Sequence, residues 1–220
     1  MENLRKLVLF TTAICFIVIS TPVAANDPDM LQDLCVADLN STIKVNGYPC
    51  KSAFNGSDFF TDVLSKPAPT NNTMGATVTL ANVQKIPGLN TLGVSMARVD
   101  YAVGGLNPPH IHPRATEIVY VLEGELDVGF ITTANVLIAR TIKKGEVFVF
   151  PRGLVHFQKN NGDVPAVAIA GFNSQLQGTA SIGVTLFGSN PPVQDDVLTK
   201  AFQIGTKEVK KIKSRFAPKS

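Results

Sequence analysis

The sequence is poor in the residues that many metal and redox sites use, with only three histidines and three cysteines among 220 residues. No Cys-x-x-Cys pair occurs, which excludes the common cysteine-based zinc motifs. Strand-like segments do not alternate with helical ones, which argues against a parallel sheet. Long apolar segments are also scarce, because only residues 7–19 form an extended run that is both apolar and free of charge. That run is shorter than the roughly 20 residues needed to span a membrane, so no membrane span is expected.

The single apolar run has the layout of a secretory signal. Arg5 and Lys6 precede it, and the small residues Val23-Ala24-Ala25 stand before the expected cleavage at Asn26. We therefore expect residues 1–25 to be a signal peptide and the mature protein to be secreted into the extracellular space.

Two cysteines, Cys35 and Cys50, remain once the signal peptide with Cys15 is removed. An even number of cysteines in a secreted chain indicates a disulfide, because the compartment is oxidising and makes two free thiols the less favoured alternative. A bridge that closes a loop of about 15 residues contributes about 3 kcal/mol in the chain-entropy model.

Three N-glycosylation sequons occur in the polar first third of the chain, at Asn40, Asn55 and Asn71. Each triplet is common by chance, but three of them in a secreted chain lead us to expect at least one glycan.

The formal net charge is +3, and the basic residues gather near the C-terminal end. These residues are Lys207, Lys210, Lys211, Lys213, Arg215 and Lys219. Nucleic acid is disfavoured as a partner, because few aromatic residues accompany the basic ones and the chain is secreted. A solvated helix face is the simplest interpretation, and an anionic cell-wall polymer stays open as a partner.

The pattern of apolar residues divides the expected mature chain into three parts. Residues 26–75 are rich in loop-forming residues, with a Pro- and Asn-rich stretch near their end. Residues 76–193 contain short runs rich in Val, Ile, Phe and Thr, separated by Gly-containing turns, which predict a β-sandwich or barrel. The expected strands lie at 76–83, 91–102, 116–122, 125–132, 136–142, 147–151, 154–158, 166–172 and 181–187.

Residues 194–220 predict two short helices. Asp195 and Asp196 can cap the first helix, and Gly205 ends it. Val209, Ile212 and Phe216 follow at helical spacing on one face of the second. We expect these apolar stripes to be buried against a neighbouring subunit.

Two of the three histidines stand one residue apart, in the stretch PPHIHPRATE. On a strand, His110 and His112 would point to the same side and could share a cation. Glu117 would face away on an unbroken strand. Pro113 cannot donate a ladder hydrogen bond, so we expect a bend after it that turns Glu117 inward from the next strand.

The third histidine, His156, follows a turn at Pro151 and Gly153. A lone histidine on an apolar strand is more often a core residue, but together with the HxH pair and Glu117 it favours a metal site. Three nitrogen ligands and one oxygen ligand without sulfur argue against soft-ligand sites. Four protein ligands favour a six-coordinate manganese or iron ion over zinc, and the ligands alone do not choose between those two.

These residues resemble a known family. Residues 104–117, closing at Gly124, are similar to the first germin motif of the cupin superfamily, and residues 145–160 are similar to the second. Residues 27–38, 90–96 and 186–192 also resemble germins, so the resemblance covers essentially the whole expected mature chain.

The resemblance implies an all-β cupin jelly-roll barrel with a short C-terminal helical extension. It implies manganese bound by His110, His112, Glu117 and His156, with iron less favoured, and a Cys35–Cys50 disulfide. It also implies a homohexamer, arranged as a trimer of dimers, that is a glycoprotein of the plant apoplast or cell wall.

Family activities include oxalate oxidation and superoxide dismutation, and many members are described only as defence-related or storage-like. Asn107 matches one of two asparagines thought to hold the oxalate of true oxalate oxidases, but Ala97 replaces the other. Losing a hydrogen bond to a charged group costs about 1.5–3 kcal/mol. We therefore favour manganese superoxide dismutase acting on a small anionic substrate, with Asn107 orienting water or the anion. Oxalate oxidase, and a cell-wall, receptor-like or storage protein with a structural metal, are the alternatives.

Overall fold

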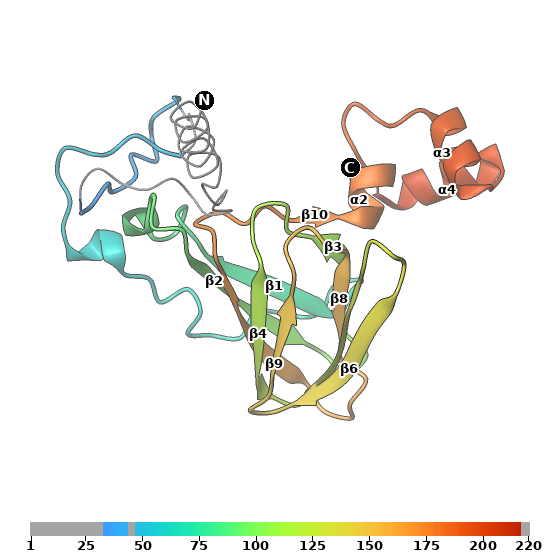
Figure 1. Cartoon of the computed structure of the whole chain (residues 1–220), viewed down its shortest axis with the longest axis horizontal. Helices are drawn as coiled ribbons and strands as arrows, with labels where there is room; N and C mark the ends of the chain where they lie inside the picture. Colours follow the sequence, from blue (N-terminus) through green and yellow to red (C-terminus); the bar gives the residue numbers. More distant parts are fainter. Residues whose placement is uncertain (1–32, 44–46, 217–220) are drawn as a thin grey trace, which may run out of the picture.

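Two five-stranded antiparallel sheets form a flattened barrel in the computed structural model, which describes residues 33–43 and 47–216 (Figure 1). The expected signal peptide lies outside the described residues. In hydrogen-bonded order, the first sheet contains β1 (Ala76–Ala81), β2 (Ser95–Tyr101), β9 (Ala166–Phe172), β4 (Glu117–Glu123) and β7 (Val147–Phe150). The second contains β10 (Ala180–Ser181), β3 (Leu106–Ile111), β8 (His156–Lys159), β5 (Glu125–Ile131) and β6 (Leu137–Lys143). The expected all-β barrel is confirmed.

Strict alternation of buried and more exposed residues along β9 and much of β4 explains why the first sheet forms a wall of the barrel. The inward residues meet those of the second sheet in one apolar core. This core contains Val99, Tyr101, Val119, Val121, Leu126, Val128, Ile142, Phe150, Ala166 and Ala168. At one end of the barrel the inward residues Ala97, Ala115 and Ala170 are small and form a separate cluster with Phe172. Small side chains there leave room for a cavity.

The outward face of the first sheet is unusually apolar for a solvent-facing surface. Met96, Ile118, Tyr120, Val147 and Val149 all project from it and are between two-fifths and about half exposed. Apolar patches of this kind mark interaction surfaces.

The segment before the barrel is loop-rich, as expected, and carries a short 3-10 helix, η1 (Gly56–Phe59). Cys35 and Cys50 form the expected disulfide, with Cα atoms 4.8 Å apart. A backbone bridge between Ala37 and Cys50 runs beside it. The amide nitrogen of Asn90 also donates to the carbonyl oxygen of Tyr48 at 2.7 Å, which ties this segment to the loop after η2 (Pro87–Leu89).

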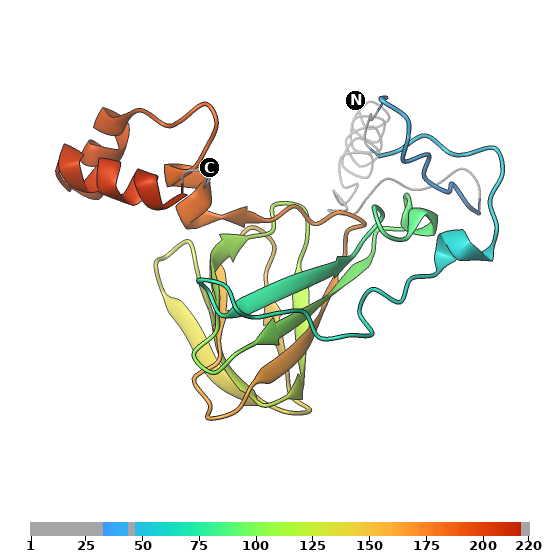
Figure 2. The ribbon, with the colours of Figure 1, turned by 180° about the vertical axis from the view of Figure 1, so that it is seen from behind.

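The C-terminal region differs from the expectation. The strand expected at 181–187 is wrong, because β10 ends at Ser181 and residues Ile182–Phe187 form a helix, α2. Three helices therefore follow the barrel, since α3 (Asp195–Phe202) and α4 (Thr206–Phe216) come next. They lie together to one side of the barrel end, as the view from behind in Figure 2 shows.

Packing among the helices explains why the apolar run 182–187 leaves the sheet. The ring of Phe187 lies 5.5 Å from that of Phe202 and 6.4 Å from that of Phe216, measured between centroids. Leu198 and Val209 are fully buried within the chain by this packing. Part of the expected apolar stripe is thus already covered inside one subunit. None of the helices in the described part of the chain is long and apolar enough to cross a lipid bilayer.

Candidate metal centre

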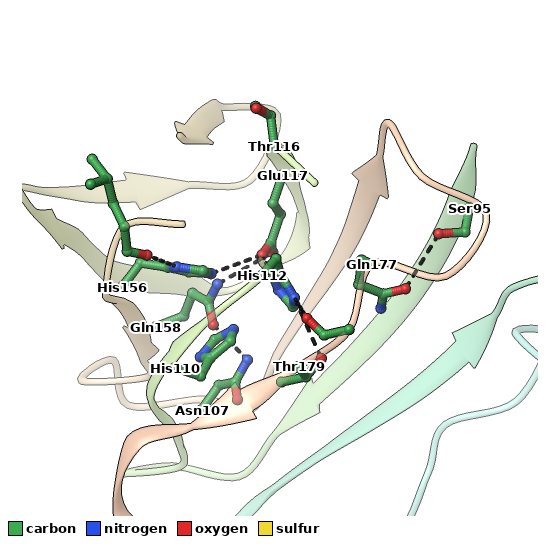
Figure 3. Close-up of polar contacts among 12 residues, drawn as sticks. Ser95, Asn107, His110, His112, Thr116, Glu117, His156, Gln158, Gln177 and Thr179 are labelled. Carbon is green, nitrogen blue, oxygen red and sulfur yellow. Dashed lines mark hydrogen bonds and ion pairs between the residues drawn. The ribbon is translucent and has the colours of Figure 1, made fainter. Parts of the chain in front are cut away.

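The four residues expected to bind metal come together from both sheets (Figure 3). His110 lies near the end of β3 and His156 begins β8, both in the second sheet, whereas Glu117 begins β4 in the first. His112 follows β3 directly. The expected bend is present between His112 and Glu117, and it carries the chain from one sheet to the other.

The pairing of β3 with β8 sets the positions of the histidines. His110 is the register partner of His156, and Asn107 is the partner of Gln158, with a register shift between the two pairs. The shift accommodates Pro108 and Pro109, which cannot donate hydrogen bonds to a ladder. Because of this bulge, Asn107 and His110 both line the same cavity although three positions separate them.

The ligand atoms of His110, His112, Glu117 and His156 all lie within 4.8 Å of one another. Glu117 Oε2 is 3.0 Å from His112 Nε2 and 3.1 Å from His156 Nε2. All four side chains are buried. This is the spacing of groups that surround one ion, and it matches the set expected from the sequence.

Backbone carbonyl groups fix the tautomer of each histidine. His110 Nδ1 lies 2.8 Å from the oxygen of Pro108, His156 Nδ1 lies 2.8 Å from that of Leu154, and His112 Nδ1 lies 3.2 Å from that of Gly178. A carbonyl oxygen only accepts, so Nδ1 carries the proton and the neutral ring presents an Nε2 lone pair to the centre.

This arrangement fits a cation. In the neutral rings, the Nε2 lone pairs of His112 and His156 face an oxygen of Glu117 that also carries only lone pairs. Either a proton or a metal ion must lie between such atoms. Three nitrogens and one carboxylate oxygen form a donor set for a divalent transition metal.

The ionisation states also suit metal binding. Burial raises the pKa of Glu117, but contacts with His112 and His156 outweigh burial when their Nε2 atoms carry protons, and these contacts hold the pKa at about 2. Glu117 is therefore a carboxylate, and a metal ion between these atoms would take the place of the protons. Burial, together with the nearby His156, lowers the pKa of His110 to about 4. His110 is therefore neutral at physiological pH, with its lone pair available to a metal.

Sequence reasoning missed Gln158, which is buried beside the ligands. Its Nε2 donates to Glu117 Oε1 at 3.4 Å, and its Oε1 accepts from Asn107 Nδ2 at 2.7 Å. Asn107, the expected catalytic residue, is thereby linked to a ligand through Gln158. The signal was present, because Gln158 follows His156 by two residues on one strand and so shares its face.

A cavity of about 250 Å³ adjoins the ligands. Its apolar wall contains Val78, Leu80, Ala97, Val99, Ala170 and Phe172. Its polar lining, apart from the ligands, contains Asn107, Gln177 and Thr179. The fully buried Ala97 thus presents a methyl group where an asparagine would present an amide.

The three sequon asparagines, Asn40, Asn55 and Asn71, are all exposed and none lines the cavity. Asn55 also caps η1, since its side-chain oxygen accepts from the backbone nitrogen of Ser57 at 2.9 Å.

Comparison with known proteins agrees with this geometry. The cupin family model matches residues 63–210. Germin-like protein subfamily 2 member 1 of Arabidopsis thaliana is 65% identical over 219 residues, which cover 99% of this chain and 98% of the relative. The rhicadhesin receptor of Pisum sativum is 72% identical over 193 residues, which cover 87% of this chain and 89% of the relative. A solved structure of recombinant oxalate oxidase in complex with glycolate has a TM-score of 0.83 and 49% identity, covering 86% of this chain and 98% of that one. The germin resemblance is confirmed, and the chain belongs to the cupin family as a germin-like protein.

Proposed function

We propose that this protein is a secreted manganese enzyme of the plant apoplast that dismutes superoxide. The observation that carries the proposal is a buried donor set of three histidines and one glutamate beside a small cavity whose wall has Ala97. Four protein ligands leave two positions of a six-coordinate ion free. When bound, manganese would supply an electron acceptor and donor at a site that a small anion can reach.

The surrounding residues have separate tasks in this proposal. The backbone carbonyls behind His110, His112 and His156 hold the rings in the tautomer that a metal requires. Gln158 holds the carboxylate of Glu117 in position through the hydrogen bond from its Nε2 to Glu117 Oε1. One hydrogen of the Asn107 amide is committed to Gln158, and its second hydrogen remains to orient an anion or a water molecule in the cavity.

A comparison of manganese-loaded and zinc-loaded protein tests this function. Zinc fits nitrogen and oxygen ligands but has no redox chemistry. We expect the manganese form to dismute superoxide, whereas with the zinc form superoxide should disappear no faster than in buffer alone. Elemental analysis measures the metal content, so that the two forms are compared at equal metal occupancy. Equal rates for both forms would refute the proposal. Full manganese occupancy without turnover would favour the non-enzymatic alternative.

Oxalate oxidation is the second candidate, favoured by the likeness to oxalate oxidase. Ala97 argues against it, since a methyl group cannot hold a carboxylate. We expect Ala97→Asn to raise hydrogen peroxide release from oxalate by one to two orders of magnitude, because one charge-assisted hydrogen bond is worth about 1.5–3 kcal/mol.

The matched control for that variant is Ala97→Leu, which fills similar space in the cavity without an amide. It should leave oxalate turnover at the wild-type level. If Ala97→Asn behaves like Ala97→Leu, the identity of residue 97 does not explain low oxalate activity. Strong peroxide release by the wild type itself would instead make oxalate oxidase the leading function.

A receptor-like or storage role with a structural metal is the remaining alternative, and one relative is named as a receptor. The basic helix α4, which carries Lys207, Lys210 and Lys211, would in that case retain the protein on an anionic cell-wall polymer.

We further propose that the protein is a homohexamer built as a trimer of dimers. The apolar outer face of the first sheet supports this assembly, since burial of such a patch stabilises association. The disulfide supports passage through an oxidising compartment. Exposed Asn40, Asn55 and Asn71 are the proposed glycan positions.

A further inference from the structure

The three histidine ligands differ in what supports their rings. His110 and His156 each face a carbonyl oxygen of their own segment, two residues earlier in the chain. His112 Nδ1 instead faces the carbonyl oxygen of Gly178 at 3.2 Å and the hydroxyl oxygen of Thr179 at 3.4 Å, 66 and 67 residues away in the sequence (Figure 3). The position of His112 therefore depends on what holds that distant segment in place.

The distant segment, residues 173–179, runs from β9 in the first sheet to β10 in the second, and we call it the crossing segment. Gln175 anchors it to the loop between β1 and β2. The carbonyl oxygen of Gln175 accepts from the backbone nitrogen of Val83 at 3.1 Å, and its side-chain oxygen accepts from the backbone nitrogen of Thr91. The crossing segment is therefore only as fixed as the loop that contains Val83 and Thr91.

The loop closed by the disulfide packs on this same anchor. The side chain of Asn90 pairs with both backbone groups of Tyr48, since Oδ1 accepts from its nitrogen at 3.3 Å and Nδ2 donates to its oxygen at 2.7 Å. Asn90 Nδ2 also lies 3.4 Å from Cys35 Sγ. A Cβ on Gly47 would lie 3.5 Å from Asn90 Oδ1 and 3.5 Å from Gln175 Nε2, so the backbone of the disulfide loop lies against both amides.

These contacts connect the disulfide to a metal ligand without a gap. The connection runs from the disulfide loop through Asn90 and its neighbour Thr91 to Gln175, and then along the crossing segment to Gly178 and His112. Asn90 is fully buried, so its amide cannot exchange the backbone of the disulfide loop for water without a cost. The disulfide joins residues 15 positions apart and restricts the loop that supplies these backbone groups.

We infer that Asn90 and Gln175 are positioning residues for the metal centre, and that the Cys35–Cys50 disulfide makes retention of the ion sensitive to reduction. While the disulfide is closed, its loop holds the two amides, and the crossing segment keeps a carbonyl oxygen behind His112. Once the disulfide opens, the loop gains conformational entropy and this support weakens, so His112 turns away from the ion more often. The inference rests on the metal centre of the proposed function but does not depend on dismutation.

Reduction by a dithiol is the chemical step that opens the loop. Cys50 is exposed, whereas Cys35 is 8% exposed, so an attacking thiolate reaches the sulfur of Cys50. The S–S bond breaks and Cys35 leaves as a thiolate. The second thiolate of the reductant then attacks the mixed disulfide and releases Cys50, so the reductant ends as a disulfide. Its two protons pass through solvent to the two cysteine thiolates.

The rate at which manganese leaves the loaded protein tests the inference. Wild type and Cys35→Ser/Cys50→Ser are loaded with manganese(II) and mixed with excess chelator. We expect release from the double variant to be about tenfold faster or more, because loss of support for a ligand costs about 10–100-fold in metal affinity. Wild type opened with a phosphine reductant, which brings no thiol of its own to bind metal, should show the same rise. Reoxidation should reverse it, and thiol titration checks that the disulfide has opened.

Val121→Ala separates this effect from a general loss of stability. Val121 is fully buried in the barrel core and does not line the cavity beside the ligands. Its truncation leaves a void that lowers the melting temperature, but the support of His112 is intact, so manganese release should stay within about twofold of wild type. All release rates are compared at one temperature, well below the melting temperature of every variant.

Asn90→Ala tests the proposed connection while the disulfide stays closed. It removes both hydrogen bonds to the backbone of Tyr48 and should accelerate release about as much as opening the disulfide. Opening the disulfide in this variant should then add less than about twofold, because both changes interrupt one connection and their effects are not additive. Fully additive effects would overturn the role given to Asn90.

Equal release rates from the closed and the opened protein would overturn the inference, and so would an equal rise in Val121→Ala. If the double cysteine variant does not fold, phosphine-treated wild type and Asn90→Ala decide by the same criteria. Faster release from an opened protein that does not dismute superoxide when loaded would leave the inference standing and refute the proposed function. Dismutation by a protein whose release rate ignores the disulfide would do the reverse.

Discussion

His156→Ala is expected to weaken manganese binding by more than about a hundredfold and to bring dismutation down to the rate of buffer. Loss of a residue that only supports a ligand costs 10–100-fold in metal affinity, and loss of the ligand itself costs more. His156 also faces Glu117 at 3.1 Å and pairs in register with His110, so its removal takes away one of the four grouped donors. Manganese content after dialysis and the dismutation rate measure the two effects.

A graded control accompanies this variant. Gln158→Leu keeps all four ligands but removes the hydrogen bond to Glu117 Oε1, so its manganese affinity should fall less, by about 10–100-fold. His156→Ala also unstacks Phe150, whose ring centroid lies 4.6 Å away, and leaves a buried void. Thermal scans of the metal-free proteins separate that packing loss from the loss of metal. Full manganese retention by His156→Ala would mean that His156 is not a ligand.

Chelation of the metal from wild-type protein is expected to lower the melting temperature by about 10 °C. An ion held at a thousand times its Kd stabilises the native state by about 4 kcal/mol. In a chain of this size each kcal/mol corresponds to about 2–4 °C. The site has little else to compensate, because buried lone pairs face each other once the cation leaves. Calorimetry with and without a chelator measures the shift.

Two comparisons make this result specific. Manganese added back should restore the melting temperature, whereas magnesium should not, because magnesium prefers oxygen ligands and water. The chelator should barely change the melting temperature of His156→Ala, because this variant has no tightly held ion to lose. A wild-type melting temperature that chelation leaves unchanged would show that the metal does not contribute to stability.

Most of the barrel could be predicted because its strands follow simple rules. Alternating apolar residues and Gly-containing turns mark β4, β5 and β9 almost to the residue. The grouping of His110, His112 and Glu117 followed from side-chain alternation and from the inability of Pro113 to continue a ladder. These properties depend only on residues close together in the sequence, so they can be recognised without knowing the fold.

The features that were missed depend on contacts between distant segments. The apolar run 182–187 fits a strand or a helix equally well, and only the rings of Phe202 and Phe216 decide for the helix. Gln158 lies inside the second germin motif, but an amide is not a residue that a search for metal ligands selects. Its role emerges from the β3–β8 register, which places it between Asn107 and Glu117.

Drawing the ligands from both walls of the barrel has a practical consequence for anyone who prepares this protein. Neither wall alone holds enough donors, so a chain whose two sheets have not closed on each other cannot retain an ion. The ratio of bound manganese to polypeptide in a batch is then a gauge of the properly assembled fraction, with a ceiling of about one ion per chain. A batch that falls short should be refolded or discarded before its catalytic constants are compared with those of another.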